Sequence, residues 1–142
     1  MVLDNNLGNI MEEITEHNLI GLMQERFPKF VAHWEVYVSE FGLDKGLEDH
    51  MRVFVVYVVN EIKSENHDQI EIIFEFVETL MVNGHQRVLD VTAIEILEVL
   101  LGKDPEEIQF VNFSRHLGKR SKAYLRAWEA FQGTRTEGLY DD

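Results

Sequence analysis

The spacing of apolar residues in segment 68–82 limits most narrowly what this chain can fold into. On a helical wheel these residues fill one broad arc: Ile70, Ile73, Phe74, Phe76, Val77, Leu80 and Met81. Glu71, Glu75 and Glu78 gather on the opposite side, at spacings that a helix brings to one face. In a strand, Glu78 would lie on the other face from Glu71 and Glu75, so the pattern predicts a helix.

Similar spacing recurs along most of the chain, between Gly, Pro and Asn residues that punctuate it. Segment 46–63 is ambiguous, because its run 53–59 is rich in β-branched and aromatic residues that favour strands. Its apolar residues nevertheless keep helical spacing over four turns, and no other stretch offers a strand partner, so we expect a helix. The expected helices span residues 7–26 (with an alternative that breaks near Asn18), 28–41, 46–63, 67–83, 86–101, 105–116 and 119–131.

Short connections between these segments imply that neighbouring helices pack antiparallel. No repeat, low-complexity tract or linker divides the 142 residues, a length that suits one domain. The sequence therefore predicts an all-α fold over residues 1–142: a single-domain helical bundle, or a short stack of antiparallel helix pairs, with about six to seven helices. We expect residues 133–142, which follow the last predicted helix, to form a loose tail.

Motifs of the common catalytic and metal-binding chemistries are missing. The chain has no cysteine, which removes disulfide scaffolds, cysteine-ligated zinc and thiol catalysis. It also lacks the HExxH, ExxH, GxSxG, GxxxxGK[ST] and GxGxxG patterns. Glu13 and His17 are helical neighbours, but lone pairs of this kind are common on solvated helices. We therefore expect no catalytic residues, no metal and no cofactor.

The negative charge of the chain is distributed unevenly. The formal net charge is −13, and residues 1–102 carry the whole excess, whereas residues 103–142 hold equal numbers of acids and bases. Such a surface repels nucleic acid and anionic membranes and attracts basic partners, although solubility alone explains the charge equally well. No apolar run approaches the ~20 residues of a membrane helix, and the N-terminus lacks the pattern of a signal peptide. We therefore expect a cytoplasmic protein.

Two predicted helices, 67–83 and 86–101, carry acids among aliphatic residues on the face opposite their core stripe. A mixed face of this kind is costly to expose, so either a neighbouring helix or a partner protein covers it. Both alternatives stay open. If a partner covers it, that partner should be basic, because carboxylates steer encounter while aliphatic groups supply buried area. The candidate partner-binding residues are Glu61, Asp68, Glu71, Glu75, Glu78, Val82, Val91, Glu95 and Glu98.

A basic stripe follows in the last third of the chain, formed by Arg115, Lys119, Lys122 and Arg126 at helical spacing. Segment 105–131 can be interpreted as a helix-turn-helix, with its turn at Gly118. A chain of this net charge would approach DNA only at great cost, so we expect no nucleic-acid binding. The stripe more readily packs near the acidic helices or borders a partner site.

Three short segments resemble a known group of proteins: Phe74-x-Phe76-x-Glu78-x-Leu80, Ile96-Leu97-Glu98-x-Leu100, and Leu117-Gly118-Lys119 ahead of a terminal helix. Together with the helix layout of residues 20–130, they resemble the small, acidic, all-helical bacterial immunity proteins of polymorphic toxin and contact-dependent growth inhibition systems. The resemblance implies a cytoplasmic protein that binds and blocks one cognate toxin domain, and such toxins are frequently basic nucleases. Because the group shares no site motif, the resemblance assigns no residues.

The leading hypothesis is therefore a non-enzymatic immunity protein that neutralises a basic toxin domain through an acidic helical face. The alternative is a regulatory or adaptor module for another basic partner. A helix-turn-helix DNA-binding protein is a third, weaker interpretation.

Overall fold

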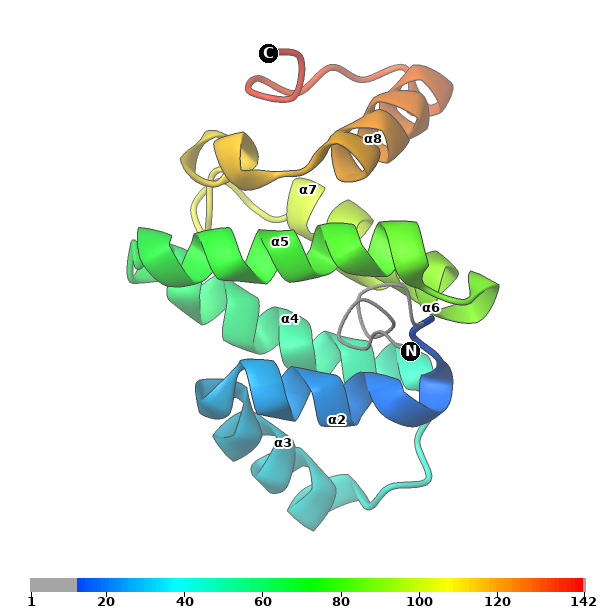
Figure 1. Cartoon of the computed structure of the whole chain (residues 1–142). Coiled ribbons are helices and arrows are strands. Elements are labelled where there is room, and N and C mark those ends of the chain that lie inside the picture. Colours follow the sequence, from blue (N-terminus) through cyan, green and yellow to red (C-terminus); the bar gives the residue numbers. More distant parts are fainter. Residues whose placement is uncertain (1–12, 142) are drawn as a thin grey trace, which may run out of the picture.

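A computed structural model of the chain describes residues 13–141, and these contain helices and turns but no strand (Figure 1). The elements are α2 (Glu16–Arg26), α3 (Pro28–Phe41), α4 (Leu47–Lys63), α5 (His67–Asn83), α6 (Gln86–Val91), the π-helix η1 (Thr92–Glu98), α7 (Val99–Leu101), the 3-10 helices η2 (Phe110–Asn112) and η3 (Ser114–His116), and α8 (Lys119–Gln132). The predicted all-α class is confirmed, and the ambiguous run 53–59 is helical. No helix within the described range is long and apolar enough to cross a membrane.

Helix α4 lies at the centre of the fold, in contact with α3, α5 and η1. Its apolar residues are buried nearly all round, which explains the long run that also suits a strand. An aromatic cluster joins it to its neighbours: the ring of Phe27 lies 5.5 Å from that of Phe54 and 5.3 Å from that of Phe76. Figure 1 shows α2 and α3 on one side of α4 and α5, and α8 on the other.

Helix α2 begins at Glu16 and residues 13–15 are not helical, so the expected helix 7–26 is interrupted there; residues 7–12 lie outside the described range. Thr15 and Asn18 cap this start reciprocally. The Asn18 backbone N–H donates to Thr15 Oγ1 at 3.4 Å, and the Thr15 N–H donates to Asn18 Oδ1 at 2.8 Å. The described chain thus leaves the helical conformation just before Glu16, close to the break that the alternative places near Asn18.

Segment 105–116, expected as a helix, forms a turn followed by the short helices η2 and η3. The side chains that it buries include Ile108 and Phe110, which are two residues apart. An α-helix would point such a pair in nearly opposite directions, so both reach the core only in an irregular backbone. The predicted helix is therefore wrong here: Asp104 caps the start of the segment, but only one turn follows it.

The expected helix 86–101 is present, but its middle part, residues 92–98, is the π-helix η1. Each π turn holds more residues than an α turn, so the segment rotates side chains away from the positions that an ideal wheel gives them. Thr92, at the start of η1, is buried, and its hydroxyl donates to the Val88 carbonyl at 2.7 Å. Val88 and Val91, expected on the outward face, are both buried.

The tail is not loose as expected, because residues 133–141 fold back onto α8. Leu139 is fully buried, and the Arg126 Nε–H of α8 donates to its carbonyl at 2.9 Å. The Tyr140 hydroxyl donates to Glu129 Oε1 of the same helix, also at 2.9 Å. The tail is thus part of the packed structure.

Candidate protein-binding surfaces

Glu61, expected as an outer charge of a partner site, is buried on α4. The Asn66 side-chain amide donates to Glu61 Oε1 at 2.9 Å, and Lys29 Nζ of α3 lies 3.9 Å from the same oxygen. Its carboxylate therefore joins the α4–α5 connection to α3 and is not available to a partner.

Glu78 on α5 also serves the fold rather than a partner, because it caps the start of α8. Its carboxylate accepts the backbone N–H groups of Arg120 and Ser121 at 2.6 and 3.0 Å, and the Ser121 hydroxyl at 2.8 Å. A negative group at this end of a helix satisfies free N–H donors and complements the helix dipole. A Cβ on Gly118 would lie only 2.4 Å from Glu78 Cδ, so any larger residue there would push the Glu78 side chain away from its place at the cap.

For segment 86–101, the alternative in which neighbouring helices cover the mixed face holds, because Glu95 and Glu98 bond to α4 and α8. The side chain of Glu95 is only 12% exposed, and Arg52 of α4 donates to it at 3.2 Å. Glu98 accepts a hydrogen bond from the Tyr124 hydroxyl of α8, and Val91 is buried. Glu95 and Glu98 lie in the π-helix η1, which shifts their side chains from the positions of an ideal α-helical wheel, whereas Val91 precedes it in α6.

Four of the expected residues stay at the surface, all on α5. Asp68, Glu71, Glu75 and Val82 are exposed and share one outward stripe with Ile72. Among the described residues, none lies within ion-pair distance of these three carboxylates. Ile72 is 40% and Val82 is 52% exposed. We call this set the α5 stripe. It retains the mixture of acids and aliphatics that the sequence predicts.

The basic residues do not form one continuous helical stripe. Arg115 lies in η3, where it donates to the neighbouring His116 ring at 3.3 Å, whereas Lys119, Lys122 and Arg126 lie on α8 beyond the turn. Arg126 holds the tail. Lys119 begins α8 beside the carboxylate of the capping glutamate, which fits the expected place near the acidic helices. Segment 105–116 offers no first helix for a helix-turn-helix.

A second surface, not found from the sequence, lies at the end of α3 and in the loop that follows. Three large apolar side chains are exposed there: Val36 at 61%, Phe41 at 56% and Leu43 at 63%. A shallow groove of about 400 Å³ runs along one side of this region, lined by Trp34, Glu35, Val38, Ser39 and Leu43. We call it the α3 groove. The sequence contains one sign of this surface: Leu43 is an apolar residue in a loop, 42–46, that otherwise holds only glycine and charged residues.

An aromatic cluster forms the floor of this region. The His50 ring of α4 packs edge-on against Trp34 at 5.0 Å and against Tyr37 at 5.7 Å between ring centroids. Burial lowers the pKa of His50, with Asp49 opposing it, and burial raises the pKa of Tyr37 with a further contribution from Asp49. Both side chains are therefore neutral at physiological pH. Within the described part of the chain, the Tyr37 hydroxyl and His50 Nε2 have no hydrogen-bond partner.

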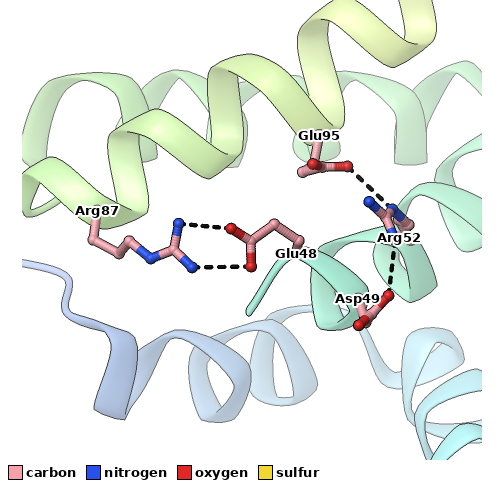
Figure 2. A network of polar contacts seen from close by, with 5 residues as sticks. All are labelled: Glu48, Asp49, Arg52, Arg87 and Glu95. Atoms are coloured by element: carbon pink, nitrogen blue, oxygen red, sulfur yellow. Dashed lines mark hydrogen bonds and ion pairs between the residues drawn. The ribbon is translucent and has the colours of Figure 1, made fainter. Parts of the chain in front are cut away.

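An ion-pair network holds the first turns of α4 against α6 and η1 (Figure 2). Arg87 of α6 holds Glu48 through two contacts of 2.9 and 2.8 Å, and its hydrogen bond is the main reason that the pKa of Glu48 is lowered. Arg52 donates to Asp49 at 2.8 Å and to Glu95 at 3.2 Å. Asp49 in turn lines a smaller depression of about 190 Å³ beside Tyr37. The network thus ties the start of α4 to α6 and η1.

No set of three or more metal-binding side chains converges anywhere in residues 13–141. The described residues thus present two surfaces suited to a macromolecule, the α5 stripe and the α3 groove. Both combine carboxylates with exposed apolar groups, which is a composition suited to protein recognition.

Comparison with known proteins gives one match. A family model described as "Domain of unknown function (DUF7674)" matches residues 20–133, which is most of the chain. No curated protein and no solved structure matches significantly. These comparisons do not bear on the resemblance to immunity proteins.

Proposed function

Because the chain belongs to the DUF7674 family, whose description names no activity, we propose its function from its own surface. The proposed function is to bind and neutralise a basic partner protein. In its most specific form, the chain is an immunity protein for a cognate toxin domain, for example a basic nuclease. This role requires no catalytic residue, metal or cofactor.

The observation that carries this proposal is the α5 stripe. Asp68, Glu71 and Glu75 are exposed on one face of a single helix without an ion-pair partner among the described residues, whereas acids such as Glu48, Glu78 and Glu95 contact cations or backbone N–H groups. Unpaired carboxylates on a chain of net charge −13 attract a basic surface over distances of about a Debye length. Ile72 and Val82 supply apolar area that such a partner would bury on contact.

The position of the stripe also suggests how a partner would be oriented. Lys119 and Arg120 begin α8, and the Arg120 backbone N–H binds Glu78 of α5, so the start of α8 brings two cationic residues close to α5. A partner that places basic side chains over the stripe would be repelled near these residues. They therefore favour one orientation of a basic partner over its reverse.

The experiment uses the toxin domain encoded directly upstream of this chain, where an immunity gene is expected to follow its toxin gene. Growth of cells that express this domain, with and without the chain, measures neutralisation. With both proteins purified, stopped-flow association at low salt measures steering. Failure of the chain both to restore growth and to bind the purified domain would contradict the proposal.

Charge reversal locates the surface. Glu71→Lys combined with Glu75→Lys should slow association by at least about tenfold at low salt, and by less at high salt. The control is Glu25→Lys combined with Glu106→Lys, which makes the same change in net charge at exposed positions outside the stripe. Equal effects of the two double variants would show that net charge, rather than the stripe, governs the encounter.

Other outcomes separate the alternatives. A basic partner that is not toxic would identify the chain as an adaptor or regulator. DNA binding predicts a salt-dependent gel shift with random duplex DNA, and we expect no shift because the helix-turn-helix lacks its first helix.

A further inference from the structure

The α3 groove has an apolar lining with a single charged residue. Trp34, Val38 and Leu43 form most of its surface, and the charged residue among those that line it is Glu35. Trp34 is almost buried, so its ring forms the floor, whereas Leu43 is largely exposed and forms a wall. A groove of about 400 Å³ is large enough to receive a bulky apolar side chain.

The charges around the groove are negative and unpaired. Glu35 lines it, Asp44 directly follows Leu43, and no described cation lies within ion-pair distance of either carboxylate. The nearest lysine in the loop, Lys45, has its Nζ 6.0 Å from the centre of the Phe41 ring, beside the other depression. The surface therefore combines an apolar slot with an acidic border.

We propose that the α3 groove binds a basic amphipathic helix of a partner protein, which inserts one large apolar side chain between Val38 and Leu43 and places Lys or Arg near Glu35 and Asp44. The mode is helix-in-groove recognition, in which an amphipathic helix lays its apolar face into a hydrophobic groove. Addition of a strand is a poor alternative, because it needs an open sheet edge and the described residues contain no strand. A second copy of this chain is a poor occupant, since it would bring more negative charge to the same acidic border.

This proposal does not rest on the immunity function. The groove and the α5 stripe lie on different helices, with α3 at the bottom of Figure 1 and α5 above it. A partner that engages the stripe leaves the groove free for a second contact, and either surface can fail its test without the other.

The probes are synthetic 18-residue helical peptides. One carries a Leu and Trp stripe flanked by Lys, the second replaces every Lys by Glu, and the third replaces the apolar stripe by Ser. The chain has only two tryptophans, Trp34 in the groove and Trp128 on α8, so their indole N–H signals in an NMR titration form a paired reporter. The basic apolar peptide should shift the Trp34 signal saturably while that of Trp128 stays in place.

A matched pair of variants tests the location. Glu35→Lys with Leu43→Lys changes two residues that line the groove and should weaken binding of the basic peptide at least about tenfold. Glu40→Lys with Val36→Lys makes the same charge change at exposed positions of α3 that do not line the groove, and should weaken binding less than about threefold.

Four results would overturn the proposal. The first is absence of saturable binding, and the second is equal binding of the acidic or the serine-substituted peptide. The third is an equal loss of affinity in the two double variants. The fourth is a Trp34 signal that moves with protein concentration in the absence of peptide, because that would identify a second copy of the chain as the occupant.

Discussion

Acidic residues on the α8 side of the molecule and at the α3 end have opposite surroundings. On the α8 side, Glu78, Glu98 and Glu129 each accept hydrogen bonds from backbone or side-chain groups of α8 or the tail. At the α3 end, Glu35 and Asp44 have no ion-pair partner among the described residues and lie beside exposed apolar side chains. The first group holds the fold together, whereas the second leaves its charge to solvent or a partner.

This difference shows that formal charge alone does not locate a binding surface. A carboxylate that accepts several hydrogen bonds contributes to folding stability, and its charge is largely compensated. An exposed carboxylate contributes little to stability but extends its field into solvent. Stability measurements should therefore separate the two groups, and the following predictions run from the largest expected effect to the smallest.

Replacement of Glu129 should have the largest effect. Its buried carboxylate accepts the Thr136 backbone N–H and the Tyr140 hydroxyl, both at 2.9 Å, and also the hydroxyls of Thr134 and Thr136. Glu129→Ala leaves these donors unsatisfied, so the free energy of unfolding should fall by about 2–4 kcal/mol in urea titrations. The control Glu137→Ala removes an exposed acid of the same tail and should cost less than about 0.5 kcal/mol. Equal losses would refute the distinction.

Gly118→Ala should weaken the cap of α8. The added methyl group lies 2.4 Å from Glu78 Cδ and must displace the carboxylate from its N–H donors, at a cost of about 1–2 kcal/mol by thermal or urea unfolding. Gly21→Ala is the control, because its Cβ meets nothing within 4 Å inside α2 and should raise stability by up to about 1 kcal/mol. In a Glu78→Ala background, the effect of Gly118→Ala should largely vanish. Additive effects would show that the two residues are not coupled.

The contribution of Glu129 should also depend on pH. Burial favours its neutral acid, but hydrogen bonds from Thr136, Tyr140 and Thr134 outweigh burial and lower the pKa of Glu129 below its ordinary value of 4.5. A lowered pKa means that the charged form is stabilised by folding, so this stability is present above pH 4.5 and is lost as the pH falls below it. The difference in unfolding free energy between the unmodified protein and Glu129→Gln should therefore become smaller as the pH falls below 4.5. A gap that stays constant from pH 6 to pH 3 would be inconsistent with this.

Acids at the α3 end should give the smallest effect. Glu35→Gln and Glu40→Gln remove exposed charges without ion-pair partners in the described structure, so each should change the unfolding free energy by less than about 0.5 kcal/mol. Differential scanning calorimetry of the double variant tests both together. A loss above 1 kcal/mol would place these residues among those that hold the fold together, and would remove them as free groups for a partner.

Much of the fold could be predicted from the sequence, because the helices depend on the spacing of apolar residues within each segment. Apolar spacing in 28–41, 67–83 and 119–131 follows the α-helical period closely, and the observed helices agree within one residue at each end. The ambiguous run 53–59 also became a helix, since its side chains pack on several sides of α4.

The candidate site was less predictable, because its outcome depends on contacts between distant segments. The neighbouring sequence does not distinguish Glu75 from Glu78. Glu75 is exposed, whereas Glu78 binds Ser121, which lies 43 residues further along the chain. Sequence spacing likewise assigns Trp34 to the core, and only the position of Leu43 in the folded loop makes it the floor of a groove. Hydrophobic periodicity shows which side of a helix is buried, but not which polar groups meet across helices.

The π-helix η1 has a consequence for comparing this chain with its relatives. Its hydrogen bonds pair each residue with the fifth along the chain rather than the fourth, so it accommodates an extra residue between two α-helical ends. A relative with one residue fewer between 92 and 98 would form an uninterrupted α-helix. Its residues before and after this segment would keep the positions of α6 and α7. Alignments of the family should therefore open a single-residue gap inside this helix, rather than in the loops where gaps are ordinarily placed.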